Sequence, residues 1–331
     1  MRLRFALAAL VMAPALVMAP ALAAAEPAIL RYGQAFSAVR SIYSLPIFVA
    51  DREGFFTREG LAFHNILIPG GGENMVKALE DGTVDLTHVA TPFLIAQALA
   101  GSDAVAIAAE FANPIYSLVA RPEIATISDL RGRTIGMADP AGTIAYSSWK
   151  LLAMSGVREV DVRVKTISGT PQRLACLQRG PCDAVPLGQP EDFEALDEGF
   201  RRLGVSSDAV PQFLYTVTAA RRSWAASHRD QVVGYVRALG AAFRFIRNPA
   251  RRDAVVATIV ATEAVSETSA RRTLQLYFEP ERHVLPEAGE IAIAGLRQVI
   301  DFMAETGALH APLPPAERFV ELSYLHEAGI E

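Results

Sequence analysis

Three short segments place glycine where a strand would give way to a helix, and they are Gly70-Gly71-Gly72, Ala141-Gly142-Thr143 and Gly169-Thr170-Pro171. Glycine lets the backbone approach a ligand closely, and a helix N-terminus offers unpaired N–H groups with partial positive charge. Several such helix starts around one cleft favour an anionic or carbonyl-bearing molecule. The alternative is that each segment is only a tight turn, which is a use that glycine has in every fold.

The chain contains none of the common motifs of hydrolytic or nucleotide-driven chemistry. It has no Gly-x-Ser-x-Gly elbow, no His-Glu-x-x-His metal motif and no Gly-x-x-x-x-Gly-Lys-Ser/Thr phosphate loop. Its six histidines are scattered without metal-ligand spacing, at positions 64, 88, 228, 283, 310 and 326. The sequence therefore predicts a protein that is not an enzyme and that holds neither a metal nor a cofactor.

The two cysteines of the chain, Cys176 and Cys182, lie six residues apart. In an oxidising compartment this spacing permits a local disulfide between the end of a helix and the strand that follows. A metal pair and a redox pair are the alternatives. Neither has support, because no histidine lies nearby and the spacing is not Cys-x-x-Cys. We expect a structural disulfide.

Residues 1–25 have the composition of an export signal. Two arginines among the first four residues give a positive start, an apolar run extends from Phe5 to Val17, and small residues of the Ala-x-Ala type close the segment. A membrane anchor is the alternative, but Pro14 and Pro20 interrupt the run, and its core is shorter than the roughly 20 residues of a spanning helix. We expect a cleaved signal peptide and a mature protein in the periplasm.

The remaining chain is long enough for two lobes and carries little net charge. A formal charge of −5 without a basic block makes nucleic acid a poor candidate partner. Short apolar strands alternate with helix-length patterns from residue 28 onward, which is typical of βαβ units and parallel sheets. A second series of such units begins after Pro114, and a mostly helical segment follows from Ser223. We expect an α/β fold in which lobe two, 115–217, is inserted into lobe one, 26–114 and 218–331.

This organisation predicts two passages of the chain between the lobes, near 111–118 and 212–219. Two passages side by side form a natural hinge, and ligands of open α/β sheets bind beyond the carboxyl ends of the strands. Single elements are predicted as well. They include a helix from Leu45 to Phe55, and an apolar helical stripe at Val232, Val236, Leu239, Phe243 and Ile246.

Four segments carry a resemblance to a known family, in the order expected for it. The first helix of the type II periplasmic binding proteins is similar to LPIFVADREGFFTREGL. The family's glycine-rich helix start and its entry into the second lobe are similar to GGGENMVKALEDGTVDLTHVATP and ISDLRGRTIGMADPAGT. A later turn of its second lobe is similar to RLACLQRGPCDAVPLGQP. The chain most resembles the branch for aliphatic sulfonates, taurine, nitrate and the thiamine pyrimidine precursor.

The resemblance implies a two-lobed solute-binding protein of an ABC importer, the Venus-flytrap architecture. Its partners would be a small organic solute and an inner-membrane permease with a separate ATPase chain, and the protein itself would be a monomer. A sensor that docks on a membrane receptor is one alternative. A periplasmic enzyme on the same fold is another; a related family makes the thiamine pyrimidine with a cysteine-rich iron motif, and this chain has no such run of cysteines.

The resemblance also implies which residues line the ligand pocket. They come from loops in both lobes: Phe36, Ser37, Ser41, Tyr43, Gly71, Gly72, His88, Thr91, Phe111, Asn113, Thr143, Tyr146, Thr170, Arg173 and Gln189. Arg173 would pair bidentately with a carboxylate or sulfonate, or else be a solvated helix residue. His88 replaces the small polar residue expected there, and it either contacts the ligand or packs beneath the site.

Overall fold

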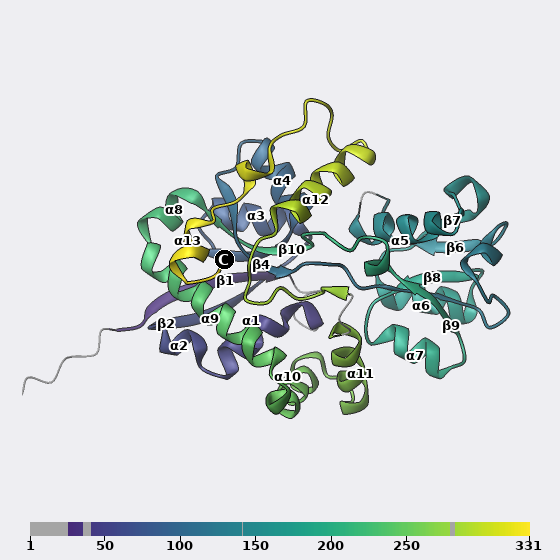
Figure 1. The fold of residues 1–331 in the computed structure, drawn as a ribbon, viewed down its shortest axis with the longest axis horizontal. Coiled ribbons are helices and arrows are strands. Elements are labelled where there is room, and N and C mark those ends of the chain that lie inside the picture. The colour runs from purple at the N-terminus through teal and green to yellow at the C-terminus, as the bar shows by residue number, and fades with distance from the viewer. Residues whose placement is uncertain (1–25, 36–40, 141, 279–281) are drawn as a thin grey trace, which may run out of the picture.

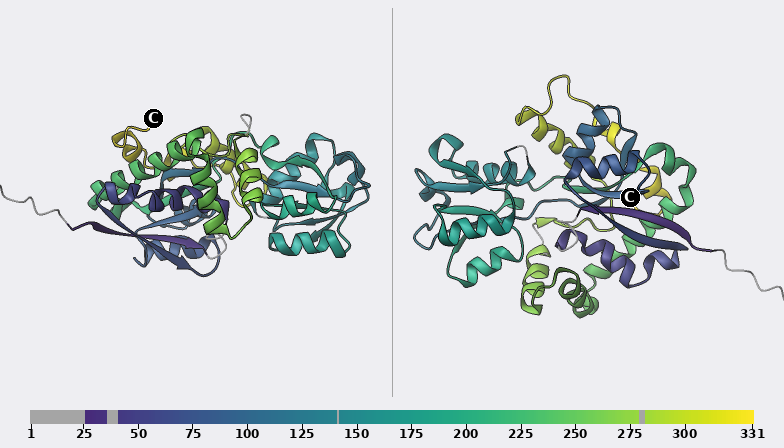
Figure 2. Two further views of the ribbon diagram at one scale, coloured as in Figure 1. Left: turned by 90° about the horizontal axis from the view of Figure 1, so that it is seen from below. Right: turned by 180° about the vertical axis from the view of Figure 1, so that it is seen from behind.

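The computed structural model describes residues 26–35, 41–140, 142–278 and 282–331. Two α/β lobes lie side by side, each built on a five-stranded sheet (Figures 1 and 2). The predicted fold class is confirmed. The signal peptide predicted for residues 1–25 lies outside the described residues.

The first sheet combines strands from both ends of the chain. Its strand order is β2 (Leu61–Ile68), β1 (Ala28–Ala35), β3 (Leu86–Ala90), β10 (Thr216–Arg221) and β4 (Ala104–Phe111). β1 is parallel to β2 and β3, whereas β10 is antiparallel to both β3 and β4. The return strand β10 therefore starts at the sheet edge where β1 and β3 end.

The second sheet repeats this plan. Its order is β7 (Arg163–Thr166), β6 (Thr134–Met137), β8 (Ala184–Leu187), β5 (Ser117–Ala120) and β9 (Arg201–Val205). β6 is parallel to β7 and β8, and β5 is antiparallel to β8 and β9. The strands of the first sheet come from segments that precede and follow the second sheet in the sequence, as expected for an inserted lobe. β10 begins two residues before the predicted boundary at 218, and the lobe limits stay a prediction.

Helices cover both sheets (Figure 1). Lobe two carries α5 (Thr143–Met154), α6 (Thr170–Arg179) and α7 (Glu191–Asp197). The early part of lobe one carries α1 (Leu45–Arg52), α2 (Phe55–Arg58), α3 (Gly72–Glu80) and α4 (Thr91–Leu99). The helical return adds α8 (Arg222–Ser227), α9 (Arg229–Arg247), α10 (Arg252–Glu263), α11 (Glu267–Tyr277), α12 (Ile293–Glu305) and α13 (Ser323–Glu327). In the part of the chain that the structure describes, no helix combines the length and apolarity needed to cross a bilayer.

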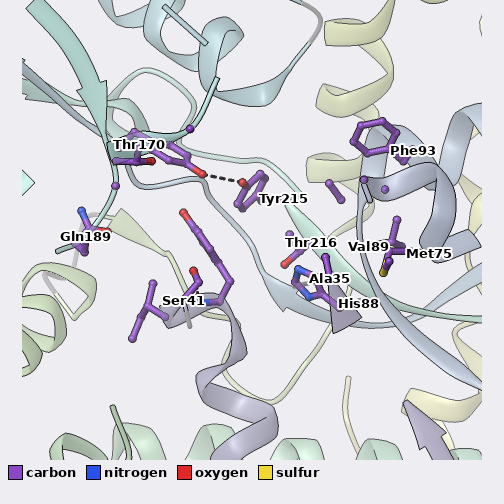
Figure 3. A pocket seen from close by; sticks show the side chains of 18 of the residues that line it. Ala35, Ser41, Met75, His88, Val89, Phe93, Thr170, Gln189, Tyr215 and Thr216 are labelled. Atoms are coloured by element: carbon purple, nitrogen blue, oxygen red, sulfur yellow. Dashed lines mark hydrogen bonds between the residues drawn. The ribbon is translucent and has the colours of Figure 1, made fainter. Parts of the chain in front are cut away.

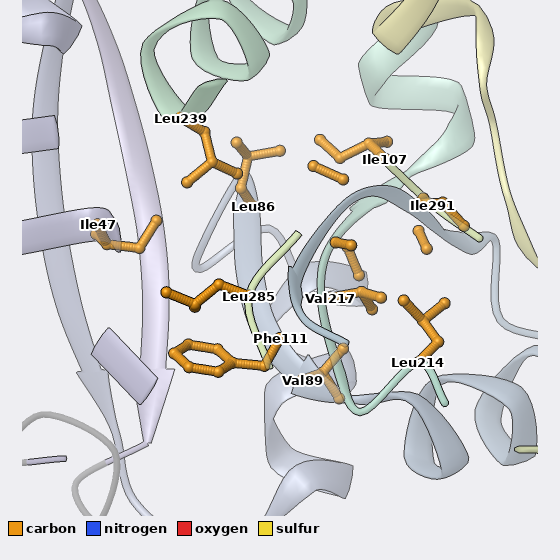
Figure 4. Packing of buried hydrophobic residues seen from close by; sticks show 14 of the residues in the cluster. Ile47, Leu86, Val89, Ile107, Phe111, Leu214, Val217, Leu239, Leu285 and Ile291 are labelled. Atoms are coloured by element: carbon orange, nitrogen blue, oxygen red, sulfur yellow. The ribbon is translucent and has the colours of Figure 1, made fainter. Parts of the chain in front are cut away.

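The largest hydrophobic core lies in lobe one, where helices pack on the first sheet (Figure 4). The apolar stripe predicted on α9 is buried along its whole length. In lobe two the alternation of strand side chains gives each face of the sheet its own core, because Leu118 belongs to one cluster and its neighbour Val119 to the other.

Two features differ from the sequence-based expectations. The helix predicted from Leu45 to Phe55 begins as expected but is shorter: Gly54 adopts φ 68, so α1 ends at Arg52 and α2 begins at Phe55. The segment between β8 and the second passage also contains α7 and β9, which the sequence analysis did not predict. β9 starts with two arginines and has little apolar alternation, so its pattern does not indicate a strand.

A disulfide joins Cys176, on α6, to Cys182, just before β8, with 5.4 Å between the two Cα atoms. Cys182 is fully buried against the second sheet, and a side chain at Gly136 would meet its Sγ at 2.7 Å. The bridge thus fixes the end of α6 to the strand that follows.

We predict that replacing both cysteines by serine lowers the free energy of unfolding by about 2 kcal/mol, because the crosslink removes entropy from the unfolded chain even when the loop is short. Urea unfolding followed by circular dichroism measures the change. Reductant should destabilise the native protein by a similar amount and leave the double-serine variant unaffected. Equal stability of the two proteins under oxidising conditions would contradict the prediction.

Candidate functional site

A cavity of about 530 Å³ lies between the two lobes (Figure 3). Lobe one contributes the last residues of β1 and β3, the start of β10 and the start of α3. Lobe two contributes the loops that follow β7 and β8, at the starts of α6 and α7. These are the carboxyl ends of the parallel strands, where open α/β sheets bind their ligands.

Two of the three glycine segments of the sequence line this cavity. Gly71 precedes α3 and Gly169 precedes α6, and neither glycine supplies a capping side chain. The first turns of both helices therefore have no side-chain acceptor for their backbone N–H groups, although Pro171 in α6 has no N–H to offer. Glycine is required at two points: Gly169 has φ 83, and a Cβ at Gly72 would lie 2.3 Å from the ring of Phe93. The segment at Gly142 is not part of this wall.

Aromatic rings form the wall between the helix starts. Tyr43 packs edge-on against Phe111 at 4.8 Å and against Tyr215 at 5.2 Å between ring centroids. The hydroxyls of Tyr116 and Tyr215 lie 3.0 Å apart, which joins the two passages of the chain (Figure 3). Burial raises the pKa of Tyr43 and Tyr215 well above the usual value, so both hydroxyls are neutral hydrogen-bonding groups.

On the lobe-one side, His88 lines the cavity and connects it to a buried polar network. Its Nδ1 lies 2.5 Å from Oε2 of Glu110, a carboxyl group that is fully buried. Oε1 of Glu110 accepts hydrogen bonds from Tyr32 at 2.8 Å and from Thr218 at 2.6 Å. Behind them, the hydroxyl of Tyr235 lies 2.7 Å from that of Thr218. The side chain of His88 is thus oriented from within the core.

Few charged groups line the cavity. Among the described lining residues, none is lysine or arginine, and Glu191 is the one carboxyl group. Desolvation raises the pKa of Glu191 from its usual value, and the neighbouring Glu194 and Asp192 act in the same direction. An anionic ligand would therefore rely on the helix starts and on His88 for its partners.

Seven of the predicted site residues line the cavity, and six others do not. Those that line it are Ser41, Tyr43, Gly71, Gly72, His88, Thr170 and Gln189. Those that lie elsewhere are Thr91, Phe111, Asn113, Thr143, Tyr146 and Arg173. Phe36 and Ser37 lie outside the described residues.

Arg173 is neither a solvated helix residue nor part of the cavity wall. Only 2% of it is exposed. Its guanidinium donates to the carbonyl oxygens of Pro186 at 2.7 Å and Ile167 at 3.2 Å, and to Oγ1 of Thr170 at 3.0 Å. Burial lowers the pKa of Arg173 from its usual value. The guanidinium is used to hold the loops around the start of α6 in place, rather than to bind an anion.

Phe111 and Thr91 are fully buried in lobe one, where Phe111 supports the ring of Tyr43. Asn113 is 1% exposed, and its side chain joins the two passages of the chain by hydrogen bonds. Its amide nitrogen donates to Pro211 at 2.9 Å, and its oxygen accepts from the backbone of Phe213 at 2.9 Å. None of these three side chains reaches the cavity wall, and their contacts here are with other parts of the fold.

Thr143 and Tyr146 lie on α5, where it meets α12 of lobe one. The ring of Tyr146 lies 4.3 Å from that of Phe302, and Lys150 pairs with Glu305 at 2.7 Å. Tyr146 borders a second cavity of about 330 Å³, separate from the first. Its aromatic ring is an interlobe packing contact.

Wall side chains that were not predicted from the sequence include Met75, Phe93, Tyr116, Glu191, Tyr215 and Thr216. A usable signal existed for three of them, since Tyr116, Tyr215 and Thr216 fall in the two predicted passages. Met75 and Phe93 follow the helical spacing of core residues and cannot be told from them by pattern. Over the described ranges, no group of three or more His, Cys, Asp and Glu side chains is arranged to hold a metal ion.

The fold and the interlobe cavity define a two-lobed binding protein of the periplasmic type. The chain belongs to the NMT1/THI5-like family, whose model matches residues 41–251. No protein of curated function matches the chain by sequence.

Solved structures of the same fold include several binding proteins. The alkanesulfonate-binding protein SsuA from Xanthomonas axonopodis pv. citri, bound to MOPS, has a TM-score of 0.68 at 18% identity, covering 91% of this chain and 100% of that one. The aliphatic sulphonate binding protein SsuA from Escherichia coli has 0.71 at 19%, covering 89% and 92%. The nitrate-binding protein NrtA from Synechocystis PCC 6803 has 0.73 at 13%, covering 92% and 89%. At these identities the likeness establishes the fold.

The last residue of α10, Glu263, lies beside Tyr277, whose hydroxyl donates to Gln189 of the cavity wall at 3.2 Å. Only 9% of Glu263 is exposed, and burial raises its pKa to about 8. The folded protein therefore holds a proton at neutral pH that the unfolded chain releases near pH 4.5.

We predict that the free energy of unfolding falls as the pH rises from about 4.5 to about 8, by roughly 1 kcal/mol per pH unit from this group. Glu263→Gln should remove that part of the slope and be more stable than the native protein at the upper end of the range. Urea unfolding at a series of pH values across this range measures the slope of the free energy of unfolding against pH. The exposed Glu123 provides the control, since Glu123→Gln should leave the slope unchanged. Parallel curves for all three proteins would contradict the assignment.

Proposed function

We propose that the protein is the substrate-binding component of an ABC-type importer, which captures a small organic solute and delivers it to a permease. The observation that carries the proposal is the cavity lined from both lobes, with two uncapped helix starts directed at it. Contacts from both lobes to one ligand bias the protein toward a closed form by hinge bending. The family membership and the fold shared with sulfonate- and nitrate-binding proteins support the same role.

We place this activity in the periplasm, after removal of residues 1–25 as a signal peptide. The closed protein would act as a monomer and present both lobes to the permease, while a separate chain supplies ATP hydrolysis. Binding occurs without chemistry, because the wall consists mainly of backbone, hydroxyl groups and rings. Lobe one is proposed to comprise 26–114 and 218–331, and lobe two 115–217.

The wall favours a small organic anion with an apolar or aromatic body. The starts of α3 and α6 and the ring of His88 suit an anionic or carbonyl group. Met75, Phe93 and Tyr43 offer apolar and aromatic surface for the remainder of the molecule.

Native mass spectrometry of the mature protein, purified from its own periplasm, tests the proposal. We expect a bound molecule of defined mass in a one-to-one complex. A thermal-shift panel of sulfonates, aromatic carboxylates, nitrate and pyrimidines follows if the protein is empty, and at least one compound should raise the melting temperature. An empty protein that no compound stabilises would contradict a solute-binding role.

Closure also depends on contacts outside the cavity, between α11 of lobe one and α7 of lobe two. Arg272 pairs with Asp197 at 2.8 Å, and its guanidinium lies 4.5 Å from the centre of the Phe193 ring. The hydrogen bond from Tyr277 to Gln189 lies in the same interface. Each contact joins the lobes at the edge of the cavity and so stabilises this arrangement relative to an open one.

We predict that Arg272→Ala weakens ligand binding about three- to tenfold, since an exposed ion pair and a cation–π contact together contribute roughly 0.7–1.4 kcal/mol. Calorimetry with the molecule identified above measures the affinity, and small-angle scattering should show a larger radius of gyration. Arg271→Ala is the matched control: Arg271 pairs with Asp253 and Glu267, both within lobe one. Equal effects of the two substitutions would show that the interlobe contact has no role in closure.

A further inference from the structure

The carboxyl group of Glu110 is enclosed in lobe one, and its charge has to be balanced there. Glu110 is 0% exposed. Its partners among the described residues are two hydroxyls, from Tyr32 on β1 and Thr218 on β10, and the imidazole of His88 on β3. Neither lysine nor arginine is among these partners. His88 is therefore the one group in contact with Glu110 that can compensate a negative charge.

The hydroxyl groups determine which carboxyl oxygen faces the ring. Tyr32 and Thr218 both donate to Oε1, and Tyr235 on α9 lies behind Thr218. Oε2 meets Nδ1 of His88. The second ring nitrogen, Nε2, has no protein partner in the described part of the chain, and His88 contributes to the cavity wall with 8% of its surface exposed.

Two proton arrangements leave this pair without net charge. In one, an imidazolium donates from Nδ1 to an ionised Glu110. In the other, a protonated Glu110 donates to Nδ1 of a neutral ring. In both arrangements the hydrogen on the remaining nitrogen, Nε2, is present, because a neutral imidazole carries one N–H and an imidazolium carries two. Because Tyr32 and Thr218 both donate to Oε1, no lone pair of Oε1 is left to carry a proton. A bare Nε2 then arises only when Glu110 is ionised and His88 is neutral, which leaves an uncompensated charge inside the core.

We propose that the His88–Glu110 pair keeps Nε2 of His88 protonated, so that His88 is a fixed hydrogen-bond donor to the ligand. This inference rests on the proposed function for its ligand, but the proton state is a property of the empty protein as well. The donor selects for a solute that presents an acceptor without hydrogen, such as an oxyanion or carbonyl oxygen. It disfavours an ammonium group at the same point, because two facing donors leave both unpaired.

A neighbouring hydroxyl supports a polar ligand group at this point. Thr216 lies opposite Ala90 across the β3–β10 pair, on the same face of the sheet as His88 and Thr218. It is 3% exposed, it lines the cavity, and its Oγ1 has no hydrogen-bond partner among the residues that the structure describes. A buried hydroxyl without a partner is costly, so a ligand oxygen shared with His88 would satisfy it.

The test is nitrogen-15 NMR of the mature protein with labelled imidazole rings at neutral pH. The signals of His88 are identified by their absence in His88→Asn. We expect Nε2 of His88 to have the chemical shift and the directly bonded hydrogen of a protonated nitrogen. An unprotonated Nε2 in the native protein would overturn the proposal.

The variant Glu110→Gln provides a second test of whether Nε2 of His88 carries hydrogen in the native protein. The carbonyl oxygen of the glutamine can still accept from Tyr32 and Thr218, so its amide nitrogen donates to Nδ1 of His88. The single hydrogen of the neutral ring is then on Nε2. Under the proposal the native protein and this variant therefore both carry hydrogen on Nε2. If hydrogen appears on Nε2 only in the variant, the native ring is an acceptor and the proposal is wrong. Thr218→Val removes one hydrogen bond but no charge, and Nε2 should stay protonated.

The solute-binding role and the protonated Nε2 of His88 can be contradicted independently of each other. An empty protein that no compound stabilises would count against solute binding, and the proton on Nε2 would still be measured directly. A bare Nε2 in a protein that co-purifies with a small molecule would remove the donor assignment and leave the binding role intact. Loss of folding in Glu110→Gln, seen by circular dichroism, would leave the native spectrum to decide.

Discussion

The arrangement of the two lobes depends on how the two passages of the chain are tied together. Asn113, in the first passage, accepts from the backbone of Phe213 and donates to Pro211 in the second. The backbone N–H of Tyr215 donates to the carbonyl oxygens of Phe111 and Ala112 at 3.0 and 2.9 Å. Since these bonds hold both passages as one unit, bending is restricted to a common hinge rather than to two independent linkers. The tyrosine pair of the cavity wall, Tyr116 and Tyr215, is positioned by the same bonds.

That constraint explains why the cavity wall is largely uncharged. The hinge residues contribute neutral hydroxyls and rings, and glycines at the helix starts bring backbone N–H groups to the surface. Partial charges of this kind are fixed in direction and do not have to be desolvated as free ions when the lobes close. A charged side chain on the wall would lose more hydration on closure and would make the closed empty form less accessible.

Much of this fold follows from local patterns, whereas the cavity wall follows from them only in part. Strands such as Ser117–Ala120 are bounded by polar residues and turns, so their limits are predictable. The glycine starts at Gly72 and Gly169 are predictable for a related reason, because few other residues fit there. Arg173 and Asn113 are different: their polar side chains indicate function in the sequence, yet tertiary hydrogen bonds to backbone carbonyls occupy both. A sequence pattern does not show whether a polar side chain has its hydrogen-bond partners within the protein. Sequence alone therefore cannot separate such residues from true ligand contacts.

In each lobe a buried ionisable side chain orients part of the cavity wall, an acidic one in lobe one and a basic one in lobe two. Glu110 belongs to lobe one and Arg173 to lobe two, and each has its hydrogen-bond partners within its own lobe. Neither charge is therefore consumed by ligand binding, and neither depends on closure for its stabilisation. Arg173 donates to the carbonyl oxygens of Ile167 and Pro186, while Glu110 orients the ring of His88. These two side chains thus shape the cavity wall through the residues that they contact, while each lobe keeps their hydrogen bonds on its own side of the hinge.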